Sequence, residues 1–294
     1  MDTPNEIREF LISRRAGLTP EQAGLPDFGG RRRVVGLRRE EVALLAGMSV
    51  EYYVRLERGN ASGVSDTVLE GVSRALQLDD AERSHLYDLV RTANDGAHPL
   101  RRRRTSRPQK VRPIVQQILD GMRDVPALVQ NGRLDVLATN RLGAAVFSPM
   151  LEQPHRPANF GRFVFEHPRA PGFYRDWDDT AAQTVALLRA EAGRAPYDRL
   201  LTDLIGELST RSEPFRRLWA SHDVREHLTG VKRLRHPVVG DLDLGYEGME
   251  LTNDRGLLLI AFSAPIGSAS GEGLRLLGSW SASAGLGAQQ TELS

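Results

Sequence analysis

Cysteine is absent from all 294 residues, and lysine is nearly absent. Without cysteine the chain has no disulfides and no thiolate metal ligands, which is compatible with a reducing compartment. The two lysines are Lys110 and Lys232, so arginine supplies almost every other positive charge. This bias, together with abundant alanine and glycine, is typical of a GC-rich genome and by itself indicates no function.

Long apolar runs are also missing. No stretch approaches the roughly 18 unbroken apolar residues of a membrane span, and the first ten residues are polar and charged, without the pattern of a signal peptide. We therefore expect a cytoplasmic protein with no membrane segment. Hydrophobic residues make up 40% of the chain, enough for buried cores. At about 150 residues per domain, the length predicts about two domains.

An excess of positive charge is missing as well. The whole chain carries a net charge of +1, and residues 1–94 contain 13 Lys and Arg against 15 Asp and Glu. Net charge therefore does not indicate nucleic-acid binding. A basic surface on this part of the chain would have to come from arginines gathered on one face.

What is present is a pattern of two short helices around a tight turn, in residues 37–59. Apolar side chains recur at helical spacing on both sides of the turn: Val42, Ala43, Ala46, Tyr53 and Leu56. Gly47 can take the positive φ that a sharp turn needs, and Ser49 is the predicted N-cap of the second helix. This arrangement is that of a DNA-reading helix-turn-helix, although a generic helical hairpin shows the same apolar pattern.

The turn motif Ala-Gly-x-Ser at 46–49, followed by Leu-Glu-x-Gly at 56–59, resembles the phage-repressor-type (XRE) helix-turn-helix family of bacterial regulators. The resemblance implies that the second helix, at 50–58, lies in the major groove of double-stranded DNA. Base contacts would then come from Val50, Glu51, Tyr52 and Arg55, and phosphate contacts from Arg39, Ser49, Arg58 and Asn60. Arginine suits guanine best, whereas tyrosine is large for a base-reading position.

Other residues of the stretch have structural interpretations. Glu51 is also favoured as a first-turn carboxylate by the helix dipole, Tyr53 has the spacing of a core residue, and Glu57 is expected to bond within the domain. Further helices are predicted at 6–16, from Thr19, at 38–46, after Ser65 and at 80–92, which makes a helical domain of residues 1–95.

Two arginine runs, at 31–33 and 101–104, have two open interpretations, as solvated segments or as contacts to the DNA backbone. The second run lies in residues 96–110, whose polar, proline-containing composition predicts a linker between domains. From residue 111 onward apolar residues recur, and the polar, arginine-rich composition ends.

The second half predicts an α+β domain at 111–282, a sheet with helices packed on one face, and a flexible tail at 283–294. Asn131-Gly132 between two apolar runs predicts a β-hairpin. Helices are predicted at 114–122, 140–147, 177–192, 197–208, 214–220 and 271–280, and further strands at 231–237, 241–246 and 257–264.

This half resembles the ligand-binding domain of MmyB-like regulators, a PAS-like domain. The resemblance rests on Pro-Ala-Leu-Val at 126–129, Ala-Thr-Asn at 138–140, Phe-Arg-Arg-Leu-Trp at 215–219 and His-Pro-Val-Val-Gly at 236–240. It implies a small, largely apolar ligand such as a fatty acid. The predicted pocket residues are Asn140, Phe147, Trp177, Trp219 and His222.

Catalytic and metal patterns are weak. His222-Asp223 is not accompanied by a Gly-x-Ser-x-Gly elbow, and His222 and His227 are spaced off a common helical face. We therefore expect no enzyme, no metal and no cofactor. The sequence predicts a homodimeric transcription regulator, with two alternatives open. One is an enzyme in the second half with a regulatory helical domain, and the other is a helical protein-interaction adaptor.

Overall fold

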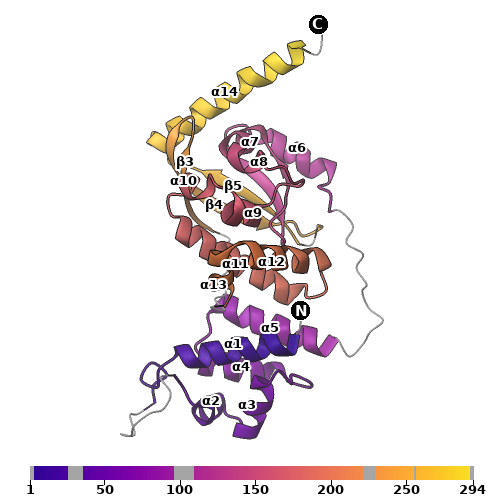
Figure 1. The fold of residues 1–294 in the computed structure, drawn as a ribbon, viewed down its shortest axis with the longest axis vertical. Helices are drawn as coiled ribbons and strands as arrows, with labels where there is room; N and C mark the ends of the chain where they lie inside the picture. The colour runs from indigo at the N-terminus through magenta and orange to yellow at the C-terminus, as the bar shows by residue number, and fades with distance from the viewer. Residues whose placement is uncertain (1–2, 26–35, 96–108, 221–228, 255, 292–294) are drawn as a thin grey trace. The chain divides into compact units, whose positions relative to one another are not determined.

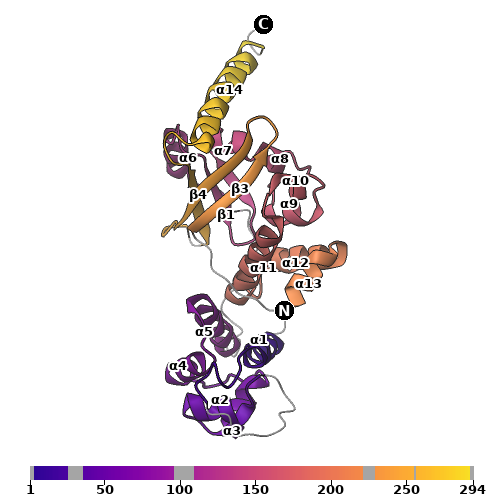
Figure 2. The same ribbon diagram turned by 90° about the vertical axis from the view of Figure 1, so that its left-hand side faces the viewer.

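The computed structural model of the protein describes residues 3–25, 36–95, 109–220, 229–254 and 256–291 (Figures 1 and 2). The chain forms two compact units, each described here by itself. The first comprises Met1–Ser106, Arg189–Asp203 and Arg217–Glu226, and the second comprises Arg107–Leu188, Leu204–Arg216 and His227–Ser294. Both arginine runs and His222 lie outside the described residues, as does most of the predicted linker.

The described N-terminal residues contain five helices, and predicted capping residues lie at the starts of three of them. The helices are α1 (Thr3–Gly17), α2 (Arg39–Ala46), α3 (Val50–Glu57), α4 (Asp66–Ala75) and α5 (Asp80–Asp95). The Ser49 and Ser65 side chains accept backbone N–H groups at the starts of α3 and α4. At α5, Asp79 and Glu82 exchange the two hydrogen bonds of a capping box. The helical class of this region is confirmed.

The helix predicted from Thr19 is wrong. Its capping hydrogen bonds do form, because Thr19 N–H donates to Gln22 and Gln22 N–H donates back to the Thr19 hydroxyl. The chain then makes only a turn, since Gly24 takes a left-handed φ of 74° and ends the helical path.

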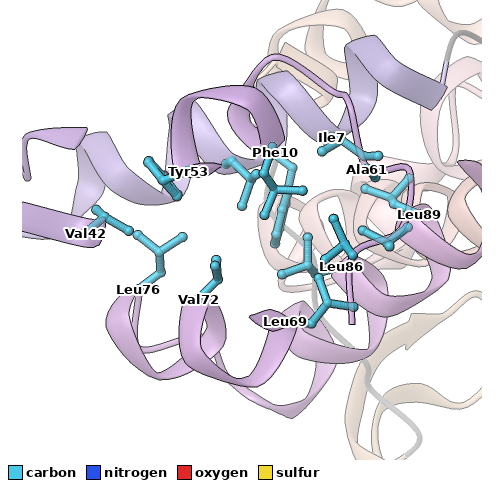
Figure 3. Close-up of a cluster of buried hydrophobic side chains, with 14 of the residues drawn as sticks. Ile7, Phe10, Val42, Tyr53, Ala61, Leu69, Val72, Leu76, Leu86 and Leu89 are labelled. Carbon is cyan, nitrogen blue, oxygen red and sulfur yellow. The ribbon is translucent and has the colours of Figure 1, made fainter. Parts of the chain in front are cut away.

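One apolar cluster holds α1 to α5 together (Figure 3). Its fully buried members include Phe10, Tyr53, Leu69, Val72 and Leu86. Burying a side chain of this size contributes roughly 1.5–3 kcal/mol. Because α3 buries only one side in this cluster, its other side remains available to a partner.

The remaining described helices are α6 (Pro113–Gly121), α7 (Arg141–Val146), α8 (Ser148–Leu151), α9 (Phe160–Glu166), α10 (Ala170–Phe173), α11 (Trp177–Arg194), α12 (Arg199–Arg211), α13 (Glu213–Ala220) and α14 (Ala269–Thr291). The short helices α8, α9 and α10 were not predicted, because four to seven residues are too few for a helical period to be recognised.

The sheet consists of β1 (Ala127–Asn131), β2 (Val136–Thr139), β3 (Thr229–His236), β4 (Gly240–Glu250) and β5 (Leu257–Ser263). All neighbours are antiparallel, in the order β2-β1-β5-β4-β3. The α+β class is therefore confirmed. The expectation of helices on one face only is wrong. Apolar residues of α6 cover Val129, Leu257 and Leu259, which are odd-numbered and share one face of the sheet, while other helices lie against the even-numbered residues.

The predicted hairpin joins β1 to β2, but its turn differs from the expected Asn-Gly turn. The residue with positive φ is Leu134, at 65°, and the register shifts between Val129 and Gln130. The longer connection carries Leu134 inward, where it is 2% exposed.

The last helix, α14, extends away from the sheet in both views and continues to Thr291 (Figures 1 and 2). The helix thus extends into residues 283–294, for which the sequence predicts a flexible tail. Among the described residues, no helix is long and apolar enough to cross a membrane.

Candidate functional site

Helix α3 has one buried and one open side. Tyr53, Leu56 and Glu57 are buried. The open side forms a shallow groove lined by Val50, Glu51, Val54, Arg55, Arg58 and Asn60. Five of the eight residues predicted to contact DNA thus share one surface. Val54 was not predicted, although it lies one helical turn after Val50 and helical spacing alone could have found it.

Arg55 is held in place at this groove. Its guanidinium carbon lies 4.8 Å from the centre of the Tyr52 ring, at cation–π distance. Tyr52 itself does not line the groove. Its part in the site is therefore to support the guanidinium of Arg55. Stacking lowers the entropy that an exposed arginine loses when it binds, so Arg55 is pre-organised toward the open side of α3.

The turn between α2 and α3 depends on Gly47. This glycine caps α2 in the left-handed region at φ 68°, and its N–H bonds back to carbonyls of that helix. Ser49 then accepts the Tyr52 N–H at 3.2 Å. The Ser49 hydroxyl, predicted to contact phosphate, thus has a structural partner and retains its own proton as a donor.

Glu57 links three elements of the helical region. Its side chain is 1% exposed and accepts the Arg15 guanidinium at 2.6 Å and that of Arg39. The Tyr53 hydroxyl lies 3.5 Å from the same carboxylate. Burial, and then the Glu57 charge, raise the pKa of Tyr53, so its phenol stays protonated. Arg39, predicted to contact phosphate, is 48% exposed while bound to Glu57.

The glycine of the Leu-Glu-x-Gly motif permits a close approach between chain segments. A Cβ on Gly59 would lie 2.1 Å from the Pro4 carbonyl oxygen, and the residue has a φ of +87°. Both constraints favour glycine. The motif thus supplies a core side chain in Leu56, a buried ion-pair partner in Glu57 and a close backbone contact at Gly59.

Ion pairs explain how a region with excess acid can present arginines on one face. Glu57, Glu70, Glu82 and Asp88 each bind an arginine away from the α3 groove. The groove itself has Arg55 and Arg58 against the single carboxylate of Glu51.

A second concave site lies in the second unit, between the even-numbered face of the sheet and neighbouring helices. Its lining is mostly apolar: Leu128, Leu134, Phe147, Phe160, Leu187, Tyr246, Gly248, Leu258, Ile260 and Phe262, with Gln130, Gln183 and Lys232 as the polar members. This kind of lining is that of a small-molecule site, but the cavity measures about 60 Å³, so a ligand larger than a few atoms would have to widen it.

The charged group of this cavity is Lys232 on β3. Its ammonium donates to the Gln183 side-chain oxygen at 2.7 Å and lies 5.7 Å from the centre of the Phe160 ring and 5.5 Å from that of Tyr246. Burial lowers the pKa of Lys232 to about 8, against a smaller opposing effect of Asp179. The sequence interpretation missed this residue. The alternation of residues along β3 could have indicated Lys232. Leu234 and His236, which share its face of the strand, are buried, whereas Arg233 and Arg235 on the other face are exposed.

Of the four predicted pocket residues that the structure describes, Phe147 lines this cavity, and the fifth, His222, lies outside the described residues. Asn140 instead caps α7 and bonds the backbone at Ala127, Met122 and Val125. The Trp177 indole donates to the Val164 carbonyl. Trp219 lies under the guanidinium of Arg189, whose carbon is 4.3 Å from the ring centre. Asn140 is buried and the two tryptophans are partly buried, and all three side chains have structural partners instead.

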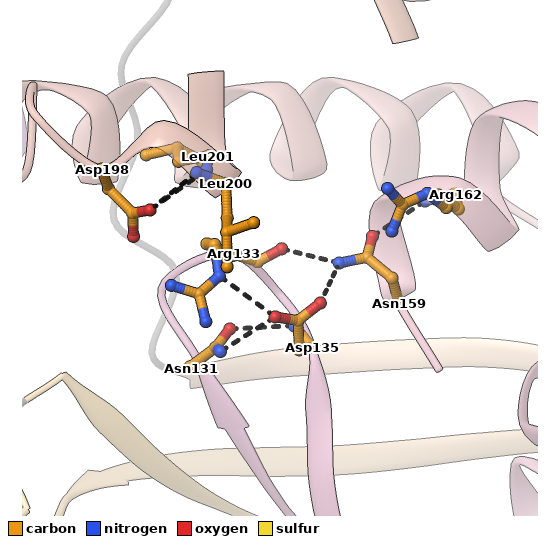
Figure 4. Close-up of polar contacts among 8 residues, drawn as sticks. All are labelled: Asn131, Arg133, Asp135, Asn159, Arg162, Asp198, Leu200 and Leu201. Atoms are coloured by element: carbon orange, nitrogen blue, oxygen red, sulfur yellow. Dashed lines mark hydrogen bonds and ion pairs between the residues drawn. The ribbon is translucent and has the colours of Figure 1, made fainter. Parts of the chain in front are cut away.

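A polar network holds the hairpin turn that places Leu134 in the cavity (Figure 4). Asp135 accepts hydrogen bonds from Asn131 at 3.0 Å, Arg133 at 3.2 Å and Asn159 at 2.8 Å. Asn159 also donates to the Arg133 carbonyl and caps α9. The network thus fixes both residues that flank Leu134.

Replacing Asp135 by alanine is expected to destabilise the second unit by about 2–3 kcal/mol, because buried amide donors lose their acceptor. Amide hydrogen exchange of β1 and β2, followed by mass spectrometry on the full chain, measures the loss. Glu152→Ala is the control, since the Glu152–Arg169 pair is exposed on both sides and should contribute less than about 1 kcal/mol. Equal protection in both variants would contradict a structural role for the network.

Two family models match the chain, one in each half. A helix-turn-helix domain model matches residues 29–86, which contain α2, α3 and α4. Together with the arginine-bearing groove, this defines the protein as a DNA-binding transcription regulator. The model of the MmyB-like transcription regulator ligand binding domain matches residues 111–277, more than half of the chain. The chain therefore belongs to the family of regulators with an MmyB-like ligand-binding domain. No curated protein matches it.

Proposed function

We propose that α3 reads base edges in the major groove of an operator. The observation that carries this proposal is the groove on the open side of α3, where Arg55 is stacked on Tyr52. Arg55 binds guanine, Glu51 accepts from a cytosine amino group, and Val50 and Val54 contact thymine methyl groups. We assign the helical domain, residues 1–95, to the XRE class on the motifs at 46–59.

Phosphate contacts would come from two residues that line the groove and from two at helix starts outside its lining. Arg58 and Asn60 follow the end of α3, while Arg39 and Ser49 lie at the starts of α2 and α3. Arg58→Ala is expected to weaken binding to operator and random DNA alike and to reduce the salt slope by about 1. Anisotropy titrations over a salt series measure both effects. A loss confined to the operator would instead make Arg58 a base contact. Arg39 is a poorer test, because its replacement also removes a partner of Glu57.

The protein would act as a homodimer in the cytoplasm. A two-fold dimer places two recognition helices about one helical turn of DNA apart, roughly 34 Å, on a pseudo-palindromic site. Selection of binding sequences from a random duplex library with the full chain tests the proposal. It predicts enrichment of two inverted half-sites with a guanine in each. Failure to enrich any motif would exclude base reading by α3.

We further propose that the PAS-like domain, residues 111–282, senses a small, largely apolar ligand such as a fatty acid. The cavity between the sheet and the helices supports this assignment. A ligand changes DNA binding only if it has different affinities for two arrangements of the protein. The test is operator affinity measured with and without a ligand that binds the cavity. An unchanged affinity would exclude the regulatory coupling.

A further inference from the structure

The first unit is not built from N-terminal residues alone. Besides α1 to α5 it includes Arg189–Asp203, which comprises the last part of α11, the connection that follows and the start of α12. Ala190 of this segment is 6% exposed and belongs to the same apolar cluster as Phe10 and Leu86. A segment from far along the chain therefore completes the core of the helical region, and we call Arg189–Asp203 the docking segment.

Polar contacts hold the docking segment against α1 and α5. Arg189 is 1% exposed, and its guanidinium lies 3.4 Å from the Glu6 carboxylate on α1. The Thr92 hydroxyl on α5 donates to the Gly193 carbonyl at 3.4 Å. A charge can be buried at a low cost in free energy only where an opposite charge meets it. The position of Arg189 against α1 is therefore specific.

Gly193 is a point of close approach between the docking segment and α5. A Cβ at this buried position would lie 2.8 Å from the His85 ring. The ring has little room to move, because His85 is 4% exposed and packs edge-on against Phe10, with 5.2 Å between the ring centres. Glycine costs a helix roughly 1 kcal/mol relative to alanine. The contact with His85, and not the stability of α11, explains a glycine here.

The rest of α11 belongs to the second unit. It carries Gln183 and Leu187, which line the apolar cavity, and the Gln183 side chain accepts the Lys232 ammonium at 2.7 Å. Leu187 and Ala190 are three residues apart, so they lie on the same side of the helix. Rigid secondary elements carry coupling between sites. A displacement of Gln183 and Leu187 is therefore transmitted along α11 to the docking segment.

We propose that α11 couples the cavity to the DNA-binding unit, and that Gly193 is the positioning residue through which α11 holds α5. This inference rests on the proposed DNA reading and ligand sensing. The cavity measures about 60 Å³, so a ligand larger than a few atoms has to displace residues that line it. A shift of α11 by about 1–2 Å, a common size for helix movements, changes the contact of Gly193 with His85. Because coupling is reciprocal, DNA bound to α3 changes α11 in return.

Hydrogen exchange of the full chain, with and without the operator duplex selected from the random library, tests this proposal without a ligand. In wild type, we expect operator binding to change the exchange of residues 177–194 by at least about fivefold, the lower end of typical coupling free energies. The exchange of α6 should not change, because α6 packs on the opposite face of the sheet from the cavity.

Two variants and a matched control locate the coupling. Gly193→Ala pushes α11 away from His85, so the operator should still protect α3 but leave residues 177–188 unchanged. Thr92→Val removes only the hydrogen bond to the Gly193 carbonyl and should reduce the response of residues 177–188. Gly206→Ala makes the same replacement in α12, where a Cβ meets nothing within 4 Å, and should respond as wild type does.

The outcomes separate the coupling from the functions on which it rests. If the operator protects α3 in wild type but leaves residues 177–194 unchanged, coupling through α11 is overturned while DNA reading stands. The same holds if Gly193→Ala responds as Gly206→Ala does. If Gly193→Ala unfolds the helical region, a wild-type response of Thr92→Val overturns the coupling. If no duplex binds selectively to the wild type, DNA reading and coupling are both overturned.

Discussion

Replacing Glu57 by alanine is expected to cost the helical region about 3–5 kcal/mol, the usual loss when one partner of a buried ion pair is removed. The carboxylate is 1% exposed and the Arg15 guanidinium is 15% exposed. Without Glu57, the remaining hydrogen bond of this guanidinium within the described residues goes to the Leu37 carbonyl, at 2.8 Å. Arg39 is half exposed and can turn to water. Domains of this size are stable by about 5–15 kcal/mol, so this loss is a large part of the total.

Hydrogen exchange on the full chain measures this effect at α1, α2 and α3, the elements that Glu57 joins. A loss of 3–5 kcal/mol corresponds to exchange faster by roughly two to four orders of magnitude for the most protected amides. Glu40→Ala removes the same charge from the residue that follows Arg39 in α2. Its ion pair with Arg38 is exposed, so we expect a loss of less than about 1 kcal/mol. Similar protection in the two variants would show that Glu57 is not a structural link.

Replacing Arg55 by alanine is expected to cost about 1–3 kcal/mol of binding to the selected operator and to relax the preference at one base position. The physical reason is the loss of a bidentate guanine contact from a guanidinium that Tyr52 already orients. Binding to random DNA should fall much less, because non-specific affinity depends on total phosphate contacts.

The matched control for Arg55 is Arg91→Ala. Arg91 lies on α5, is exposed, pairs with Asp88 and is not part of the groove. Its loss makes the same change in net charge and should affect operator and random DNA equally and slightly. Equal losses on both DNAs for Arg55→Ala would remove the base-reading assignment.

The helix-turn-helix could be predicted because its determinants are local. Gly47 and Ser49 set the turn through their own backbone and side chain, and helical spacing separates the groove residues from the core residues of α3. The Glu57 ion pairs could not be located, since Arg15 is 42 residues away and only the folded chain brings it to this carboxylate.

The ligand cavity was harder to predict because it is a product of sheet register. Even-numbered residues of β1, β3, β4 and β5 meet on one face only after four strands have paired. The sequence marked Trp177 and Trp219 by residue type, whereas the cavity uses Phe160 from a helix too short to predict and Lys232 from a strand with two exposed arginines.

The central claim is that the open side of α3 reads a specific DNA sequence. The most direct measurement is fluorescence anisotropy of the full chain with the DNA upstream of its own gene and a scrambled control, across a salt series. We predict tight binding to the upstream DNA, at least about tenfold weaker binding to the control, and a steep loss of affinity with salt. Equal binding to both DNAs at every salt concentration, with and without added lipid extract, would contradict the claim and assign α3 a purely structural role.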